Sequence, residues 1–325
     1  MTFTHGGIVG LGLLGGSLAL DLRRHFPRLT LTGIARRRET LEQAAELRCD
    51  GRPVFDALTT ELADARAADL VILCTPVQTA IAQVGILAPL LAPGTVVTDV
   101  GSTKRMMMNA ATALPPGVTF IGGHPMAGSD RPGLAHARAG LFCGATWALC
   151  VPPGGEKAAD RLTEVIATLG ARPLRIDPAL HDELVALTSH LPHIVAAALA
   201  TQVLGGVRGE AARPFIAGGF RDTTRIAAAD TTMWRDICLT NRDRIAAELT
   251  ALLAALEQWR DALRAGDAPH LDALLATANR DFSQEVKAGQ EARVRLIITV
   301  PDGATPNTLA LKEGESRVYT FDIPK

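Results

Sequence analysis

A glycine pattern at the start of the chain constrains the fold more than any other feature. Residues 7–15 (GIVGLGLLG) have the pattern of an apolar strand, a glycine-rich turn and the start of a helix. In this pattern Gly10 allows the tight turn, Gly12 lets a pyrophosphate approach the backbone, and Gly15 lets the helix pack on the strand. A glycine-rich turn without a ligand is the alternative, but the context of strand and helix favours a dinucleotide-binding domain.

Strand-like and helix-like segments alternate from residue 1 to residue 177. Strands rich in Val, Ile and Leu that are separated by helices are typical of a mostly parallel sheet covered on both faces. We therefore predict an α/β, Rossmann-type domain over residues 1–177. The expected strands are 7–10, 29–34, 70–74, 96–100, 118–121, 146–151 and 172–176.

The pattern changes after residue 177. Apolar residues recur at helical spacing, as in Ile245, Leu249 and Leu252, which predicts an all-α second domain over residues 178–285. Residues 286–325 hold two strand-like runs, 293–300 and 316–321, which predict a short β-hairpin extension. Two strands cannot form an independent core, so this extension must pack on another part of the protein.

The composition restricts the classes of partner. The 325 residues include 33 Lys and Arg against 34 Asp and Glu, a formal net charge of −1, so no nucleic-acid partner is expected. No apolar run reaches the length of about 20 residues that crosses a bilayer, and the apolar segment 6–20 lacks the basic start of a secretion signal. Five scattered cysteines fit a reducing compartment. We expect a cytoplasmic protein without a membrane partner.

The end of the second expected strand bears on the choice of cofactor. An NAD site of this type has an acidic residue there that binds the ribose hydroxyls, whereas an arginine accommodates a 2′-phosphate. Here Ala35 and Arg36 stand in that place, followed by Arg37. The sequence favours NADP, with Arg36 or Arg37 as the phosphate partner. The alternative is a solvated charged run at a helix start, with NAD as the cofactor.

One histidine is placed as a proton acceptor. His124 follows the expected strand 118–121 and stands between Gly123 and Pro125. Glycine permits close backbone approach, and proline restricts the turn that follows. An unperturbed histidine titrates near neutral pH. We therefore predict that His124 is presented from the strand end, on a stiff loop, as a catalytic base.

Two other expected strands end in polar residues. Thr75 and Pro76 follow the third strand, and Ser102 follows the fourth. The carboxyl ends of parallel strands line the ligand crevice, so these residues are candidates for the cofactor site. Ser102 is either a hydrogen-bond partner of a catalytic group or a plain helix N-cap, which would look the same in sequence.

The helical domain carries a cluster of Ser189, His190 and His193. Pro192 lies within it, inside a helical pattern, and predicts a kink. The two histidines are three apart, on neighbouring parts of one face, but no third metal ligand accompanies them at suitable spacing. Hydrogen bonding to substrate or cofactor is therefore favoured over two structural histidines, and both are favoured over a metal site.

A second polar cluster of this domain contains two arginines. Arg221 and Arg225 are four apart and are expected to share a helix face. A planar guanidinium is a natural clamp for a carboxylate. The alternative is a pair of surface arginines with Asp222 as a solvated partner.

These motifs follow one another in a fixed order. They are 10–17 (GLGLLGGS), 74–76 (CTP), 99–102 (DVGS), 123–128 (GHPMAG), 189–193 (SHLPH) and 219–225 (GFRDTTR). The ordered set resembles the prephenate/arogenate dehydrogenases of tyrosine biosynthesis, over roughly residues 5–285. The resemblance implies a Rossmann-type domain followed by a helical domain that forms a homodimer. It also implies hydride transfer from C4 of prephenate to NAD(P) with loss of the ring carboxylate, which gives 4-hydroxyphenylpyruvate; arogenate would give tyrosine.

The resemblance also implies roles for residues. His124 matches the histidine that deprotonates the ring hydroxyl, and Ser102 matches the serine that hydrogen-bonds this histidine. Arg225 matches the arginine that binds a substrate carboxylate, and His193 a histidine near the substrate side chain. The other expected substrate residues are Ser189, His190, Asp222 and Asp130. The expected cofactor residues are Gly10, Gly12, Leu13, Leu14, Gly15, Arg36, Arg37, Thr75, Pro76 and Ser102.

The sequence departs from the family in two places, and two alternatives stay open. Residues 35–38 lack the acidic residue of NAD-using relatives, and the C-terminal extension is too short for the regulatory ACT domain that some relatives carry. A 3-hydroxyacid dehydrogenase or imine reductase has a similar domain order, but such enzymes usually rely on a lysine in the helical domain, and residues 178–285 contain none. A nucleotide-sensing regulator would keep the fold without turnover. The presence of His124, Ser102 and Arg225 argues against this alternative.

Overall fold

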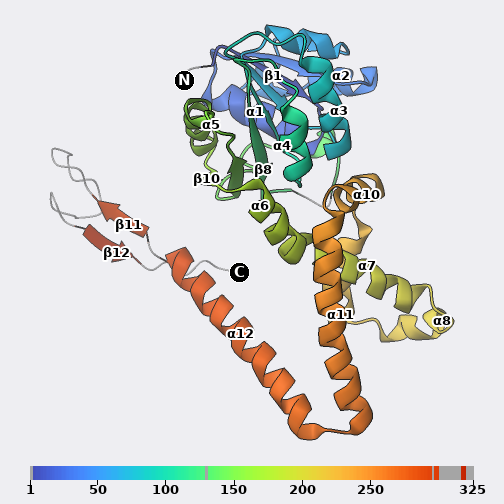
Figure 1. Cartoon of the computed structure of the whole chain (residues 1–325). Helices are drawn as coiled ribbons and strands as arrows, with labels where there is room; N and C mark the ends of the chain where they lie inside the picture. The colour runs from blue at the N-terminus through green and yellow to red at the C-terminus, as the bar shows by residue number, and fades with distance from the viewer. Residues whose placement is uncertain (1–2, 129–130, 295, 300–315, 320–325) are drawn as a thin grey trace. The chain divides into compact units, whose positions relative to one another are not determined.

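The computed structural model describes residues 3–128, 131–294, 296–299 and 316–319 (Figure 1). The chain packs into two compact units, Met1–Leu249 and Thr250–Lys325, which are described separately below. The first unit contains the sheet, its covering helices and most of the helical region. Asp130, one of the expected substrate residues, lies outside the described residues.

A sheet of eight strands forms the centre of the first unit. The strands are β1 (His5–Val9), β2 (Thr30–Ile34), β5 (Ala57–Thr59), β6 (Leu70–Leu73), β7 (Val96–Asp99), β8 (Thr119–Pro125), β9 (Thr146–Cys150) and β10 (Arg172–Arg175). Their order in the sheet is β10-β9-β8-β7-β6-β1-β2-β5. All pairs from β8 to β5 are parallel, β9 runs antiparallel to β8, and β10 is parallel to β9. The predicted mostly parallel sheet is confirmed; the short edge strand β5 was not predicted.

Helices cover both faces of this sheet, because successive residues of a strand point to opposite faces. Ile8 and Ile72 belong to the core on the face of α1 (Leu13–His25) and α5 (Glu156–Thr168). Val9 and Leu73 belong to the core on the face of α3 (Val77–Leu87) and α4 (Arg105–Ala111). All four side chains are at most 3% exposed. The covering helices are α1 (Leu13–His25), α2 (Arg38–Ala45), α3 (Val77–Leu87), α4 (Arg105–Ala111) and α5 (Glu156–Thr168).

From Pro178 to Val294 the described secondary structure is helical throughout. The prediction of a helical region over residues 178–285 is confirmed, but the helix continues into the predicted β-rich extension, as far as Val294. The helices are α6 (Pro178–Val185), α7 (Leu191–Leu204), α8 (Gly209–Ala212), α9 (Gly218–Thr224), α10 (Thr231–Thr240), α11 (Arg242–Ala265) and α12 (Ala268–Val294). A π-helical segment, Ala186–His190, joins α6 to α7, and Pro192 lies in the first turn of α7. The kink predicted at Pro192 stays a prediction, but the helix is irregular just before this residue, where proline lacks the N–H that would continue the helical hydrogen bonds.

The helical run Pro178–Leu204 meets the length and hydropathy of a membrane-spanning helix, with 28% of its most apolar window buried. Core helices pass the same test. Three of its leucines, Leu180, Leu184 and Leu187, are about half exposed. They are spaced four and three residues apart, so they form an apolar stripe along one side of the run.

The second unit consists of the end of α11, helix α12 and a β-hairpin. In the hairpin β11 (Leu296–Thr299) pairs antiparallel with β12 (Ser316–Tyr319), with Leu296 opposite Tyr319. The predicted hairpin is thus present, but its first strand begins later than expected. Arg293 and Val294 belong to α12, because strand propensity depends on a pairing partner and the ladder begins only at Leu296.

Candidate active site

The glycine turn after β1 has the shape of a dinucleotide cradle. Gly10 has a φ of +96°, a conformation that only glycine adopts readily. A Cβ at Gly10 would lie 2.8 Å from Thr75 Cγ2, and one at Gly15 would collide with the Gly10 carbonyl oxygen. At Gly12, by contrast, no atom of the described residues lies within 4 Å of the position that a Cβ would take. The turn is therefore tightly packed on one side and open on the other. The open side lies at the N-terminus of α1, which begins with Leu13 and Leu14. The glycine turn and this helix start fit the pyrophosphate of a dinucleotide.

This turn lies at the point where the strand order reverses. β1 stands between β6 and β2, and the chain continues outward from β1 on both sides. Ligands of such sheets bind at this switch point, beside the carboxyl ends of the strands. Thr75 and Pro76 follow β6 at the same edge, as predicted. Thr75 Oγ1 donates a hydrogen bond to Gln83 Oε1 at 2.7 Å, and Pro76 is the exposed N-cap residue of α3.

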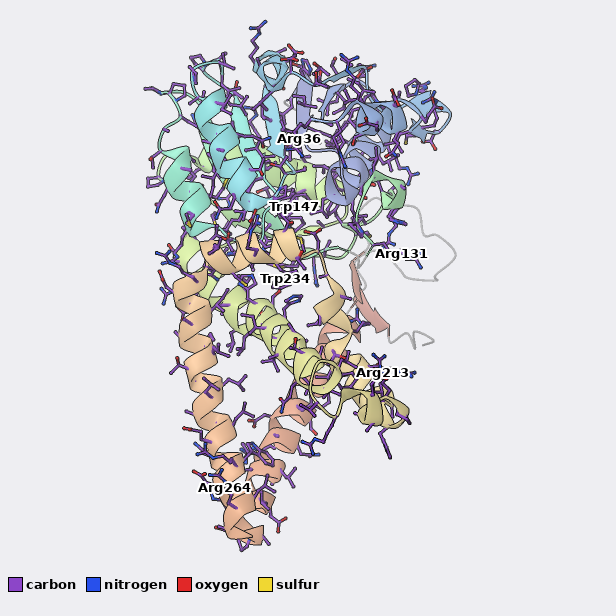
Figure 2. The ribbon with its side chains drawn as sticks, turned by 90° about the vertical axis from the view of Figure 1, so that its right-hand side faces the viewer. Arg36, Arg131, Trp147, Arg213, Trp234 and Arg264 are labelled. Carbon is purple, nitrogen blue, oxygen red and sulfur yellow. The ribbon has the colours of Figure 1, made fainter. Side chains whose placement is uncertain are left out.

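The end of β2 carries the arginines of the cofactor prediction. Ala35 is buried, whereas Arg36, which is labelled in Figure 2, and Arg37 are exposed and lead into α2. Within the described part of the chain neither guanidinium forms an ion pair. Both side chains are therefore free to meet an anionic group at this edge of the sheet.

His124 lies inside strand β8, so the predicted loop at this position is wrong. β8 continues to Pro125 because β9 pairs with it, placing His124 opposite Ala148 and Pro125 opposite Trp147. The glycines and the proline suggested a strand end at Ile121, and the antiparallel partner is not visible in the local sequence. The imidazole is thus held by a paired strand, which fixes it more firmly than a loop would.

A buried ion pair supports the backbone beside His124. Lys104 Nζ contacts Asp99 Oδ2 and donates a hydrogen bond to the Gly123 carbonyl oxygen at 2.7 Å, and both charged residues are 0% exposed. Gly123 N–H donates to Asp99 Oδ1 at 3.0 Å. A Cβ at Gly123 would collide with the Asp99 backbone oxygen. Buried charges are tolerated only when they are paired and hydrogen-bonded, and this pair anchors β8 to the end of β7.

Two residues of α6 extend the site behind His124. His124 Nδ1 lies 2.9 Å from His181 Nε2, and His181 Nδ1 lies 2.9 Å from Asp182 Oδ1. His181 and Asp182 are at most 1% exposed. Burial, followed by the nearby Lys104 cation, holds the pKa of His124 well below its usual range. His124 is therefore neutral at physiological pH and able to accept a proton.

The predicted histidine pair lies at the start of α7 beside an unpredicted tryptophan. His193 stacks on Trp234 of α10, with ring centroids 3.4 Å apart and the planes 5° from parallel. Trp234 is labelled in Figure 2. His193 Nδ1 is buried and has no hydrogen-bond partner among the described residues, whereas His190 Nδ1 lies 3.3 Å from Asn241 Nδ2. Burial lowers the pKa of both histidines, that of His190 to about 4. Ser189 is exposed.

Ser102 is not the N-cap of α4. That helix begins at Arg105, and its first N–H groups are taken up by α6: Lys104 N–H and Arg105 N–H donate to the two Asp182 oxygens at 2.7 and 2.9 Å. In the described residues no hydrogen bond joins Ser102 to His124; the contact of His124 described above is to His181. Ser102 is partly exposed at the end of β7, and its expected role stays a prediction.

The arginines of the helical domain are exposed. Arg221 belongs to α9, whereas Arg225 begins the 3-10 segment Arg225–Ala228. The expectation that both share one α-helix face is therefore wrong, because the helix tightens between them. Asp222 is also exposed and forms no ion pair with either arginine within the described residues. The carboxylate clamp stays a prediction.

Sequence reasoning missed the roles of Asp99, Lys104, His181, Asp182 and Trp234. Each of these residues is either fully buried and polar or stacked on a predicted site residue. The contacts of Lys104 and Arg105 with Asp182 join residues that are 77 or more positions apart, so the local sequence gives no sign of them. In the described parts of the chain no group of three His, Cys, Asp or Glu side chains is arranged to hold a metal ion.

The burial of His190 predicts a dependence of stability on pH. Its folded pKa of about 4 lies below the ordinary value, so between about pH 6.5 and pH 4 the unfolded chain binds a proton that the folded chain does not. Stability should therefore fall as the pH falls through this window, by about 3 kcal/mol from this residue alone. Urea unfolding at pH 7 and pH 4 of the wild type and of His190→Gln measures the effect. The variant should lose less stability on acidification, and equal losses in both proteins would contradict the assignment.

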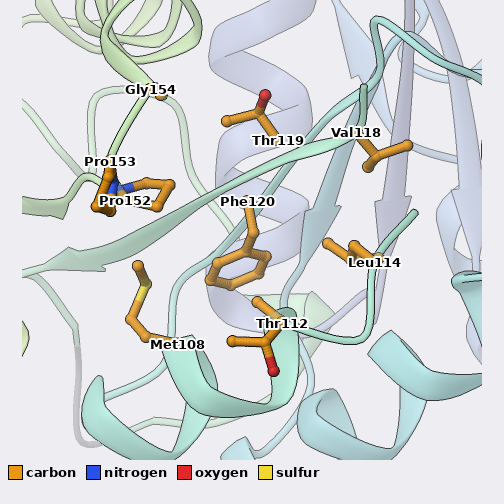
Figure 3. Close-up of a pocket in the computed structure, with 11 residues that line it drawn as sticks. Met108, Thr112, Leu114, Val118, Thr119, Phe120, Pro152, Pro153 and Gly154 are labelled. Atoms are coloured by element: carbon orange, nitrogen blue, oxygen red, sulfur yellow. The ribbon is translucent and has the colours of Figure 1, made fainter. Parts of the chain in front are cut away.

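A cavity of about 250 Å³ lies at the other end of β8 (Figure 3). It is lined by Met108, Thr112, Leu114, Val118, Phe120 and Pro152, among others. Val118 directly precedes β8 and Phe120 lies at its start, whereas His124 lies near its end. Because dinucleotides bind at the carboxyl ends of parallel strands, this cavity is not part of the candidate site.

Comparison with known proteins places the two domains in one family. Residues 18–174 match the family model of the prephenate dehydrogenase nucleotide-binding domain, and residues 177–277 match the prephenate dehydrogenase dimerization domain. The chain is 33% identical to prephenate dehydrogenase of Bacillus subtilis over 305 residues, which cover 91% of this chain and 80% of the relative.

Solved structures agree with this result. The structure of Synechocystis arogenate dehydrogenase has a TM-score of 0.74 and 32% identity, covering 87% of this chain and 100% of that protein. Prephenate dehydrogenase from A. aeolicus, solved in complex with hydroxyphenyl propionate and NAD+, has a TM-score of 0.79 and 28% identity, covering 87% and 99%. With both domains matched in order, the chain belongs to the prephenate dehydrogenase family.

Proposed function

We propose that the chain catalyses the NAD(P)-dependent oxidative decarboxylation of prephenate, of arogenate or of both, in tyrosine biosynthesis. The observation that carries the proposal is the neutral imidazole of His124, held in a paired strand at the sheet edge that also carries the glycine turn. Removing a hydride from a carbon that bears a hydroxyl requires a base for the hydroxyl proton, and His124 is the base at this edge.

Different residues of the chain serve different steps of the proposed reaction. The bound nicotinamide supplies the hydride acceptor. His124 accepts the hydroxyl proton, and the Asp99–Lys104 pair keeps the backbone beside it in place. Loss of carbon dioxide and aromatisation of the ring provide the driving force, so the main task of the protein is positioning.

The helical domain supplies the groups for the rest of the substrate. His193 is stacked on Trp234, and its buried Nδ1 has no hydrogen-bond partner among the described residues, which fits an atom that meets a ligand. Arg225 is exposed, and it is our candidate for the clamp on a substrate carboxylate. Ser102, Ser189, His190, Asp222 and Asp130 complete the proposed site.

We also propose that the protein works as a homodimer through this domain. The stripe of Leu180, Leu184 and Leu187 lies on the segment that matches the dimerization-domain model. An exposed apolar stripe of this kind is typical of a surface that a partner covers. Sedimentation equilibrium of the full chain tests this proposal, and a monomer at micromolar concentration would contradict it.

The proposed activity is tested by absorbance at 340 nm with prephenate and arogenate, each with NAD and NADP. Formation of the reduced cofactor with at least one substrate is expected. The same assay separates the alternatives: a 3-hydroxyacid dehydrogenase would reduce the cofactor with a hydroxyacid but not with prephenate, and a nucleotide-sensing protein would bind the cofactor without turnover.

The arginines after β2 predict the choice of cofactor. Ala35 leaves no carboxylate to repel a 2′-phosphate, and each charge-assisted hydrogen bond from Arg36 or Arg37 would contribute roughly 1.5–3 kcal/mol. NADP should therefore be used at least as efficiently as NAD, and Arg36→Ala should lower kcat/KM for NADP selectively. Arg52→Ala, an exposed arginine on the short strand Arg52–Pro53, is the matched control. A tenfold or greater preference of the wild type for NAD would contradict this prediction.

A further inference from the structure

Three polar side chains form a line that leads inward from His124. The His124 Nδ1 atom meets His181 Nε2, and His181 Nδ1 meets Asp182 Oδ1, each at 2.9 Å. His181 and Asp182 are removed from solvent. The direction of each hydrogen bond decides which atom of His124 is left for the substrate.

One assignment of protons satisfies the whole line. Burial alone would raise the pKa of Asp182, but hydrogen bonds from His181 and from the backbone N–H groups of Arg105 and Lys104 lower it, so Asp182 is ionised. An ionised carboxylate only accepts, and therefore His181 Nδ1 donates to it. His181 Nε2 then carries a lone pair and accepts the Nδ1 proton of His124. His124 Nε2 is left as a free acceptor.

In the proposed reaction the hydroxyl proton of the substrate leaves in one step and a proton returns to the same oxygen in a later one. As the hydride leaves C4, the hydroxyl proton leaves too, and the O–H electron pair becomes the second bond of a carbonyl. When the bond to the ring carboxylate then breaks, its electron pair aromatises the ring and arrives at the same oxygen, which takes a proton to become the phenol. The reaction therefore takes up and returns one proton, and the protein must store it between the two steps.

We propose, on the basis of the proposed function, that His181 stores this proton. As the hydroxyl proton reaches His124 Nε2, the Nδ1 proton of His124 moves to His181 Nε2, and both movements reverse when the phenol forms. His181 is thus a positioning residue that also carries the charge, and Asp182 is its counter-ion.

The charges around the two rings favour this location. Lys104 lies beside His124 through its hydrogen bond to Gly123, and its charge opposes a second positive charge there, although Asp99 compensates part of it. His181 instead contacts the carboxylate of Asp182 directly. Among the described residues, the other charged or titratable groups that face the pair are His190 and Arg105. His190 is neutral, and Arg105 Nε lies 3.6 Å from Asp182 Oδ2, where it weakens the effect of the carboxylate. The carboxylate of Asp182 therefore attracts a positive charge on His181, whereas the Lys104 cation opposes one on His124.

His181→Gln separates storage from simple orientation. The glutamine amide oxygen can still accept the Nδ1 proton of His124, but the amide cannot hold an additional proton. We expect single-turnover oxidation to slow on the order of 10²-fold, with the affinities for cofactor and substrate within about threefold of wild type. His270→Gln, at an exposed position of α12, is the matched control and should be unchanged. If His181 only orients His124, the glutamine variant will keep more than a tenth of the rate, and the proposal is overturned.

The pH profile gives a second readout. A proton that settles on the pair before the substrate arrives inactivates the enzyme, so kcat/KM falls at low pH. In His181→Gln only His124 is left to take that proton. The His124 ring lies beside Lys104 and has no carboxylate next to it. The acidic limb should move to lower pH by about one unit or more. A lower rate with an unmoved limb would be the signature of a purely structural role and would contradict storage.

A measurement on the wild type does not depend on how the variant folds. In mixtures of H2O and D2O, two protons that move together give a curved dependence of the single-turnover rate on the deuterium fraction, whereas one proton gives a straight line. A curved dependence is expected, and a straight line overturns the relay. If the wild type oxidises neither prephenate nor arogenate, it is the proposed function that fails, and the two failures are distinguished in this way.

Discussion

His124→Ala is expected to lower the rate of turnover by about 10²–10⁴-fold, the usual cost of losing a general base. The variant removes the imidazole that accepts the hydroxyl proton, but it leaves the glycine turn and the arginines after β2 untouched. Cofactor affinity should therefore stay within about threefold of wild type. Steady-state kinetics with the preferred substrate, together with fluorescence titration of the cofactor, measures both quantities.

The control for this variant is His270→Ala, which changes an exposed histidine of α12. It should keep wild-type kinetics and wild-type thermal stability. If His124→Ala kept more than a tenth of the wild-type rate, the assignment of the base would be wrong. Asp99 and Lys104 are less suitable for this test, because either change leaves an unpaired buried charge and lowers stability.

Arg225→Ala is expected to act mainly on substrate affinity. Loss of a guanidinium that clamps a carboxylate costs about 2–4 kcal/mol when the partner charge is left without compensation. This corresponds to a rise of the substrate KM of roughly 30- to 700-fold, with a much smaller change of kcat. The comparison of kcat and KM at saturating cofactor measures the two effects separately.

Arg221→Ala is the matched comparison for Arg225, because both arginines are exposed and lie in neighbouring helical segments. It should raise KM far less. An unchanged KM in Arg225→Ala together with a raised KM in Arg221→Ala would move the clamp to Arg221. An unchanged KM in both variants would remove the clamp from this segment altogether.

The fold was predictable because its determinants are local. The alternation of apolar strands and helices, with the glycine turn after β1, was sufficient to indicate a mostly parallel sheet and a following helical domain. The extent of β8 was not predictable, because its last four residues are held by the antiparallel strand β9 and not by their own propensity. Similarly, the end of α12 at Val294 depends on where the pairing of β11 with β12 begins.

The candidate site was predictable only in part. His124 and the glycine turn carry signals in their own neighbourhoods. The support of His124 does not, because the contacts of His181 and Asp182 join segments that are far apart in the sequence. His181 and Asp182 have the appearance of an ordinary polar pair in a helix. Only the packing of α6 against the start of α4 shows that they continue the hydrogen-bond line from the base.

If the proposed function is right, one turnover removes both a hydride from C4 and the carboxylate from the ring. Prephenate that carries deuterium at C4 and ¹³C in the ring carboxylate tests both parts at once, with the products followed by NMR. We expect the deuterium to appear in the reduced cofactor, ¹³CO2 to form in equal amount, and 4-hydroxyphenylpyruvate to carry neither label. For arogenate, labelled in the same way, the aromatic product would be tyrosine. Deuterium retained in the product, or cofactor reduction without ¹³CO2, would contradict the account.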